Sequence, residues 1–321
     1  MKRVVTSGDL TQHAMRPSGL HDAYVERVRA DIARFELLLG GSERSCPACG
    51  RQGNPEFVRL DFHYHRCREC ESLFVSPLPD ERHLARYHAE SEAERYRRDE
   101  MMPAIADVRT KHALAPRAYW VLTSAAARHR APLTIGHVGT TSPQLIELLC
   151  ASASVVRSVE PLSAATPASS LDCIIAFDVL EREADIARTL HQCGTQLRAG
   201  GLLFVTTMSG DGFEVRMLRE KTRSLVPPIH LQLLSRAGWE AVLARESLQL
   251  LEYSTPGELD VQAVAEACRR NPALRLPPII DELVRHEDEQ VGRAFQEVLQ
   301  QAGLSSHVQL VAEARSTSTI R

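Results

Sequence analysis

The chain has 321 residues, of which 44% are hydrophobic and 25% charged, and its formal net charge is -3. This composition is typical of a globular protein with two or three domains, and the charge argues against nucleic acid as a partner. The sequence contains no apolar run of about 18 residues, so we expect no membrane span. Two early positive charges without an apolar segment after them indicate a cytoplasmic protein.

The first half of the chain is predicted to contain helices on both sides of a cysteine-rich segment. Residues 20–40 carry apolar side chains at helical spacing, and Gly40 and Gly41 end that pattern. Residues 80–130 are charged and helical, with arginines that alternate with glutamates. A solvated helix face is the simplest interpretation of this charge pattern, and an anion-binding face is the alternative.

The cysteine-rich segment contains two Cys-x-x-Cys pairs among the eight cysteines of the chain. Seventeen residues separate Cys49 from Cys67, which is within the range of roughly 15–20 residues that is typical of zinc ribbons. Cys46, Cys49, Cys67 and Cys70 would hold one zinc ion tetrahedrally and leave no open position, so we expect a structural metal. Two unrelated redox pairs, free cysteines, or His63 and His65 as replacement ligands are the alternatives.

From residue 132 onward, short apolar strands alternate with helices, which is typical of a parallel sheet covered by helices. Strands are expected at LTIGHVG, SVVRSVEP, LDCIIAFD and GLLFVTTM, and helices at SPQLIELLCAS and IARTLHQCGTQLRAG. Residues 257–300 are predicted to be largely helical, and a last strand, HVQLVAEA, precedes a polar tail. The expected segments are a leader and helix over 1–43, a zinc ribbon over 44–78, a helical linker over 79–130, a Rossmann-like domain over 131–255 and a helical extension over 256–321.

Several stretches in the same order resemble the class I S-adenosylmethionine-dependent methyltransferases that carry an N-terminal zinc ribbon. These stretches are CESLFVSPLPDERHLARYH after the second cysteine pair, RTKHALAPRA, SVEP, FDVLE, LRAGGLLFVTT, IHLQLLS, STPGELDV and FQEVL with LSSH. The resemblance covers residues 44 to 314. It implies an α/β fold with a Rossmann-like methyltransferase sheet.

The resemblance also implies a cofactor site for S-adenosylmethionine at the carboxyl edge of that sheet. Gly139 would form the turn after the first strand, and Glu160, in SVEP, would bind the ribose hydroxyls. Asp178 and Glu181 would hold the cofactor amine or a substrate hydroxyl. His230 would act as the general base in methyl transfer.

Three departures from the family pattern affect this site. Thr141 and Pro143 stand where the family has glycines, and side chains there hinder close approach of the backbone to a ligand. Only residues 161–171 separate the second strand from the next one, so the family's third strand is expected to be missing or reduced. Arg182 stands where the family usually has histidine.

The sequence therefore predicts a methyltransferase-like protein that acts on a small metabolite such as a sugar, a nucleotide-linked sugar or a biosynthetic intermediate. One alternative is a degenerate relative that no longer uses S-adenosylmethionine and binds a partner or catalyses a different reaction. Another is a zinc-ribbon interaction module. The expected partner is a small molecule or a protein, and the sequence does not indicate an oligomeric state.

Overall fold

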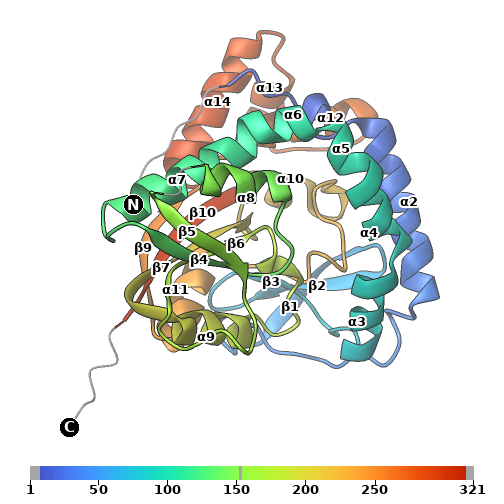
Figure 1. Cartoon of the computed structure of the whole chain (residues 1–321). Helices are drawn as coiled ribbons and strands as arrows, with labels where there is room; N and C mark the ends of the chain where they lie inside the picture. The colour runs from blue at the N-terminus through green and yellow to red at the C-terminus, as the bar shows by residue number, and fades with distance from the viewer. Residues whose placement is uncertain (1–7, 152–153, 316–321) are drawn as a thin grey trace.

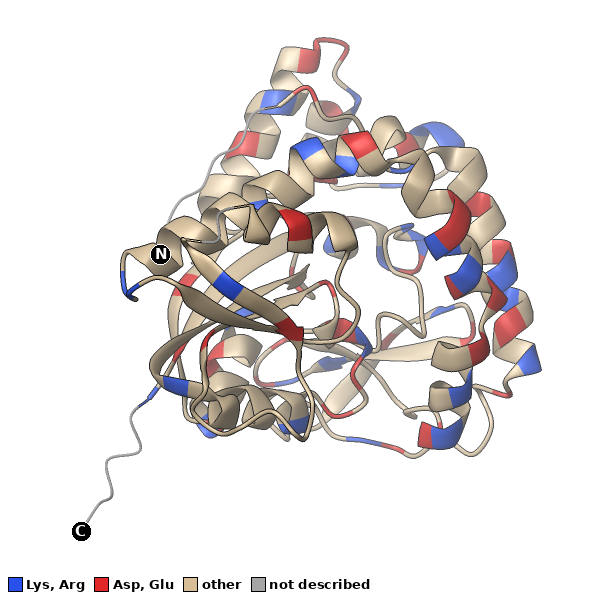
Figure 2. Ribbon diagram, viewed as in Figure 1, with Lys and Arg blue, Asp and Glu red and all other residues tan. Residues whose placement is uncertain are grey.

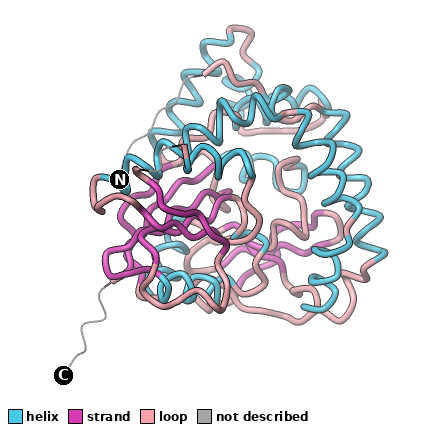
Figure 3. The backbone as a smooth tube through the Cα atoms, in the orientation of Figure 1, coloured by secondary structure: helices cyan, strands magenta, loops and turns pink. Residues whose placement is uncertain are grey.

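The computed structural model describes residues 8–151 and 154–315, and its two sheets are surrounded by helices (Figure 1). The first seven residues of the expected leader and the end of the polar tail lie outside these ranges. Figure 3 shows the strands gathered toward the middle and one side of the molecule, with helices along the outside. No helix among the described residues is both long and apolar enough to cross a membrane.

The smaller sheet contains the cysteine-rich segment. Its strands are antiparallel and follow the order β1-β2-β3-β8, with β1 at Gly53–Arg59, β2 at Phe62–Cys67, β3 at Leu73–Val75 and β8 at Gln232–Leu233. The expected helix before the ribbon is α2, Ser18–Arg34, which follows the short α1, Gln12–Met15; it ends at Arg34, before the predicted end at Gly40. Because β8 comes from the second half of the chain, the ribbon sheet is completed by a segment that lies far away in sequence.

The charged segment predicted to be helical forms a nearly continuous helical run. Two π-helical segments, η1 and η2, interrupt its α-helices, and turns of this kind often occur at functional sites. Figure 2 shows charges of both signs along this run and along α2. The elements are α3 Glu81–Glu90, α4 Glu92–Tyr96, η1 Arg97–Met101, α5 Met102–Ala104, α6 Ala106–Arg109, η2 Thr110–Leu114 and α7 Ala115–Ala126.

The larger sheet has six strands in the order β5-β4-β6-β7-β10-β9. The first four are parallel, and β10 runs antiparallel to both of its neighbours. The bounds are β4 Leu133–His137, β5 Val156–Pro161, β6 Leu171–Phe177, β7 Leu197–Met208, β9 Leu248–Ser254 and β10 His307–Ala314. This order confirms the predicted α/β class with a mostly parallel sheet.

The strands of this sheet are apolar on both faces because helices cover both. In β6, Ile174 joins the core on one face, whereas Cys173 and Ile175 join the core on the other, as the alternation of side chains along a strand requires. Residues of α7 and α8, Pro143–Cys150, pack on the second face. Residues of α9, Ile186–Gln196, and α11, Arg236–Arg245, pack on the first.

The remaining elements lie after β6 and β7 and in the C-terminal region. They are η3 Leu180–Arg182, α10 Phe213–Leu218, η4 Arg219–Lys221, α12 Asp260–Arg270, α13 Pro278–Arg285 and α14 Glu289–Ala302. The last three helices agree with the prediction of a largely helical C-terminal region, and they pack against α10 around a small core of their own.

The structure also confirms one expected departure and corrects a second predicted helix boundary. Residues 162–170 contain no strand, so the sheet has no third strand between β5 and β6 in the chain. The helix predicted through residue 200 was too long, because α9 ends at Gln196 and β7 begins at Leu197. Residues 197–200 instead extend β7, which pairs with β6 from Leu197 onward.

Candidate active site and metal centre

The carboxyl ends of the parallel strands meet at one edge of the large sheet. The chain passes from β4 to β5 on one side and then to β6 on the other, so β4 and β6 flank the point where the strand order reverses. Open α/β sheets bind ligands in the crevice outside such a point. Gly139 follows β4, Asp178 follows β6, and Glu160 lies near the end of β5, so three of the predicted site residues come to this edge.

The turn after β4 depends on Gly139. Its φ angle is +63°, in a region that L side chains rarely adopt, and a Cβ there would lie 3.4 Å from Val179 Cγ1. The side chain of His137 supports this turn, with Nδ1 2.9 Å from the Gly139 carbonyl oxygen. The next helix, α8, begins with Pro143 at its first position, so the turn offers one N–H group fewer to a ligand.

Glu160 is exposed and pairs in register with Gly136 of β4. Its side chain makes no hydrogen bond or ion pair with the described residues, so both carboxylate oxygens are available. This location is the one expected of an acid that binds ribose hydroxyls beside a glycine turn.

Asp178 is engaged by two neighbours. Its carboxylate lies 2.6 Å from a guanidinium nitrogen of Arg117, and Thr206 Oγ1 donates a hydrogen bond of 2.9 Å to it. Burial opposes ionisation of Asp178, but the charges of Arg117 and His307 and these hydrogen bonds hold the pKa of the carboxyl well below its usual range. Asp178 is therefore a fixed negative charge at this edge.

Glu181 lies one turn further on and behaves differently. It is 5% exposed, and Thr207 Oγ1 donates a hydrogen bond of 3.1 Å to it. Burial, together with the nearby charge of Asp178, raises the pKa of Glu181 to about 8. Two neighbouring carboxyls therefore have pKa values pushed in opposite directions, a pattern that is common in sites of acid–base chemistry.

His230 lies after η4, close enough to Arg182 and Asp178 for their charges to affect its ionisation. Its Nδ1 is 3.0 Å from the Val226 carbonyl oxygen, and Tyr64 donates a hydrogen bond of 2.6 Å to its backbone oxygen. Burial lowers the pKa of His230 to about 4, so the ring is neutral near pH 7. The Val226 backbone N–H donates a hydrogen bond of 3.1 Å to the same Nδ1, so this ring nitrogen faces both a donor and an acceptor of Val226, and Nε2 makes neither contact.

The sequence analysis missed the role of Arg117 as a partner of Asp178. The two residues are 61 positions apart, and no local pattern joins them. His307 completes this group, with Nε2 3.4 Å from Arg117. These long-range contacts form because α7 and β10 come together at the same edge of the sheet.

The two cysteine pairs form one cluster. The sulfur atoms of Cys46, Cys49, Cys67 and Cys70 all lie within 4.8 Å of one another. Cys46 and Cys70 are 3.6 Å apart at sulfur, and Cys49 and Cys67 are 3.4 Å apart. Zinc bound tetrahedrally at 2.3 Å from each sulfur would separate the sulfurs by about 3.8 Å, so the cluster fits a zinc ribbon.

Neither His63 nor His65 belongs to this four-residue group; His65 instead packs beside Phe74, with ring centroids 6.0 Å apart.

The cysteine cluster is part of the core on one face of the large sheet. Cys46, Cys67 and Cys70 belong to the same buried cluster as Trp239 of α11. Ser72 Oγ lies 3.2 Å from the Cys70 sulfur and accepts a hydrogen bond of 3.1 Å from the Ser235 amide. A metal in this cluster would therefore stabilise the contact between the ribbon and α11.

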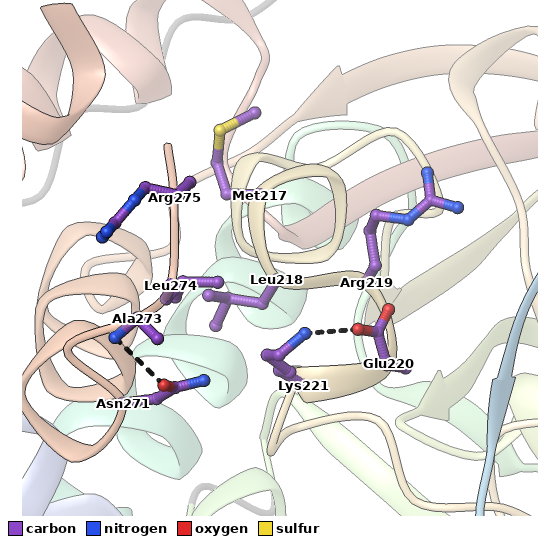
Figure 4. A pocket seen from close by; sticks show the side chains of 9 residues that line it. All are labelled: Met217, Leu218, Arg219, Glu220, Lys221, Asn271, Ala273, Leu274 and Arg275. Carbon is purple, nitrogen blue, oxygen red and sulfur yellow. Dashed lines mark hydrogen bonds and ion pairs between the residues drawn. The ribbon is translucent and has the colours of Figure 1, made fainter. Parts of the chain in front are cut away.

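A surface cavity of about 450 Å³ lies away from the sheet edge, between η4 and the loop after α12 (Figure 4). Two of its cationic side chains are already paired: Lys221 contacts Glu220, and Arg219 contacts Glu56 at 3.1 Å. A second cavity, of about 290 Å³, lies beside the turn between β1 and β2. Neither cavity contains the residues predicted for the cofactor.

The strand order defines an α/β fold with a mostly parallel sheet, and the cysteine cluster fits a zinc ribbon. Residues 105–253 match the family model described as a methyltransferase domain, so this part of the chain is a methyltransferase-like domain. No curated protein matches the chain.

Three solved structures illustrate the structural likeness. A methyltransferase in a complex with the Haloferax volcanii Trm112 methyltransferase activator is 16% identical, with 68% of this chain and 99% of that chain covered and a TM-score of 0.41. Geranyl diphosphate C-methyltransferase from Streptomyces coelicolor A3(2) is 12% identical, with coverage of 70% and 83% and a TM-score of 0.38. An S-adenosylmethionine-dependent methyltransferase from Mesorhizobium loti is 13% identical, with coverage of 63% and 100% and a TM-score of 0.35.

Proposed function

We propose that this protein transfers a methyl group from S-adenosylmethionine to a small metabolite in the cytoplasm. The observation that carries the proposal is that a positive-φ glycine and a carboxylate without a partner in the described ranges lie close together where the strand order reverses. Gly139 adopts a positive-φ turn, which supports close approach of the backbone to a ligand, and the Glu160 side chain has no partner among the described residues. Sugars, nucleotide-linked sugars and biosynthetic intermediates are the proposed acceptors.

When bound, S-adenosylmethionine supplies an activated methyl group on a sulfonium. The chain's residues orient the acceptor and remove its proton. We assign His230 as the base, because its ring is neutral and one ring nitrogen can accept a proton. Asp178, fixed by Arg117, offers a negative charge for the cofactor amine, and Glu181, protonated near pH 7, offers a hydrogen-bond donor.

The test is calorimetry of the full chain with S-adenosylmethionine and S-adenosylhomocysteine. We expect micromolar affinity for at least one of them, and we expect Glu160→Ala to weaken it roughly tenfold because the ribose loses its hydrogen-bond acceptor. Glu147→Ala, an exposed acid on α8, is the matched control and should bind as the parent does. Absence of heat at millimolar ligand would refute the proposal.

The second candidate function is a degenerate relative that binds a partner or a different ligand. It is favoured by the absence of a strand over residues 162–170, since the end of that strand contacts adenine in the resembling family. It is also favoured by Thr141 and Pro143 at the expected glycine positions. In this case the zinc ribbon and the charged helices would serve as the interaction surface, and neither cofactor form would bind.

A further inference from the structure

We propose that Arg109, together with Arg117, binds an oxyanion, either a phosphate or a carboxylate, carried by the acceptor molecule. Arg109 is the last residue of α6, and Arg117 lies in the first turn of α7, where it contacts Asp178 at the carboxyl edge of the large sheet. A guanidinium fork matches the geometry of both anions. The assignment of the anion to the acceptor rests on the proposed methyl transfer, whereas the anion site itself can be tested without S-adenosylmethionine.

The π-helical segment η2 aligns these two arginines. Two turns of an α-helix take about 7.2 residues. On a regular α-helix, two side chains eight positions apart therefore point in different directions, separated by most of the rotation between neighbouring residues. A π-turn accommodates one additional residue. Because η2, Thr110–Leu114, lies between Arg109 and Arg117, the two side chains fall on the same face of the run.

Arg109 has no partner among the described residues. It is half-buried, yet it forms no ion pair or side-chain hydrogen bond there. Burial lowers the pKa of Arg109, and the positive charges of Arg117 and Arg97 lower it further, although Asp178 acts in the opposite direction. A guanidinium held half-buried next to like charges needs an anion to offset its desolvation.

The surrounding charges leave an excess of positive charge. Arg97 and Arg182 both contact Glu94, at 3.2 and 3.5 Å, and Arg117 contacts Asp178. Arg182 also has a buried Nε without a hydrogen-bond partner. The arginines Arg97, Arg109, Arg117 and Arg182 therefore outnumber the two ionised carboxylates.

Three other titratable groups near Asp178 are neutral near pH 7. Glu181 is protonated there, and burial keeps the rings of His230 and His307 neutral. An acceptor with one or two negative charges would balance the cluster. The anion-binding face that the sequence analysis gave as an alternative for residues 80–130 would then lie where these helices meet the edge of the sheet.

The experiment is an anion titration of the full chain at pH 7 and constant ionic strength, with inorganic phosphate and malonate as probes and calorimetry as the readout. We expect saturable binding of at least one probe, and the better probe identifies phosphate or carboxylate as the anion. Arg109→Gln should weaken this binding roughly tenfold or more. Because Arg109 has no partner to lose, the variant should keep the thermal midpoint of the parent. Arg130→Gln, which removes an exposed arginine beyond α7, is the matched control.

Unsaturable binding, or equal binding by the parent and both variants, would overturn the anion site. If Arg109→Gln weakens S-adenosylhomocysteine binding and leaves phosphate and malonate binding unchanged, the arginine serves the methionine carboxylate and the proposal is wrong. If a probe binds through Arg109 but neither cofactor form binds, the anion site stands, and the proposed methyl transfer fails together with the acceptor assignment. The two proposals therefore fail separately.

Discussion

The guanidinium of Arg117 lies 2.6 Å from the carboxylate of Asp178 and joins α7 to the turn after β6. Arg117 is almost fully buried, with 8% of its side chain exposed, whereas 41% of the Asp178 side chain is exposed. The pair therefore lies at the boundary between the helical run and the open edge of the sheet. It fixes one carboxylate in the charged state next to another, Glu181, that is held in the protonated state.

Arg117→Met should lower the free energy of unfolding by about 1–3 kcal/mol, because Asp178 loses its cationic partner. The cost is below that of breaking a fully buried pair, since water reaches Asp178. Urea denaturation followed by circular dichroism measures this change. The double variant Arg117→Met/Asp178→Asn should be more stable than the sum of the two single effects predicts. Additive effects would show that Arg117 and Asp178 are not energetically coupled.

Stability should fall as pH rises from about 5 to 8 because of Glu181. The pKa of its carboxyl is about 8 in the folded chain and 4.5 ordinarily, so between these values the folded state holds a proton that the unfolded state has lost. The stabilisation is fully present below pH 4.5 and is lost as pH rises through about 8. The steepest slope is about 1.4 kcal/mol per pH unit.

Glu181→Gln isolates this effect because the amide does not titrate. Unfolding free energies of the parent and the variant, measured in guanidinium chloride at pH 5, 6, 7 and 8, should diverge in slope. The depressed pKa values of His230 and His307 act in both proteins and cancel in the difference. Parallel curves for the two proteins would show that Glu181 is ionised throughout.

Gly238→Ala should disturb the contact between α11 and the ribbon. A Cβ at Gly238 would collide with Ser72 Oγ and approach Ala48 Cβ at 3.3 Å. We expect a loss of about 1–3 kcal/mol from overpacking. Gly19→Ala in α2 is the control, since nothing lies within 4 Å of the new methyl group, and it should stabilise the chain slightly. Thermal unfolding of both variants measures these effects. An unchanged midpoint for Gly238→Ala would contradict the close packing of α11 against Ser72 and Ala48.

The sequence was sufficient to predict local features and insufficient to predict long-range ones. The spacing of Cys46, Cys49, Cys67 and Cys70 predicted their cluster, because two tight turns impose that geometry locally. The alternating strands predicted the parallel sheet, and the short segment after residue 161 predicted the missing strand. The ladder between β3 and β8 was not predictable, because β8 has only two residues and its partner is more than 150 positions away.

The same reasoning explains what was missed at the sheet edge. The ionisation of Asp178 and Glu181 depends on Arg117 and on burial, and neither follows from the pattern of residues around FDVLE. The prediction that these two acids have similar cofactor-binding roles rested on their common position after a strand. Their different environments give them different charge states, which only the packed structure reveals.

Purified protein should contain one zinc per chain, and Cys70→Ser should lose it, because three thiolates cannot complete the tetrahedron. Metal analysis after exhaustive dialysis measures this. Loss of zinc should lower the thermal midpoint by roughly 10 °C or more, since about 1 kcal/mol corresponds to roughly 2–4 °C in domains of about 150–250 residues. Cys150→Ser changes an exposed cysteine of α8 and should leave both zinc content and midpoint unchanged.

Tryptophan fluorescence gives this prediction a local readout. The chain has two tryptophans, and Trp239 is 1% exposed in the same core as Cys46, Cys67 and Cys70 of the ribbon. In a Trp120→Phe background, the emission of Trp239 should shift to longer wavelength when a chelator removes the metal, because water reaches the ring as the ribbon detaches from α11. An unchanged emission spectrum, with zinc removal verified by metal analysis, would mean that the ribbon stays packed without its metal.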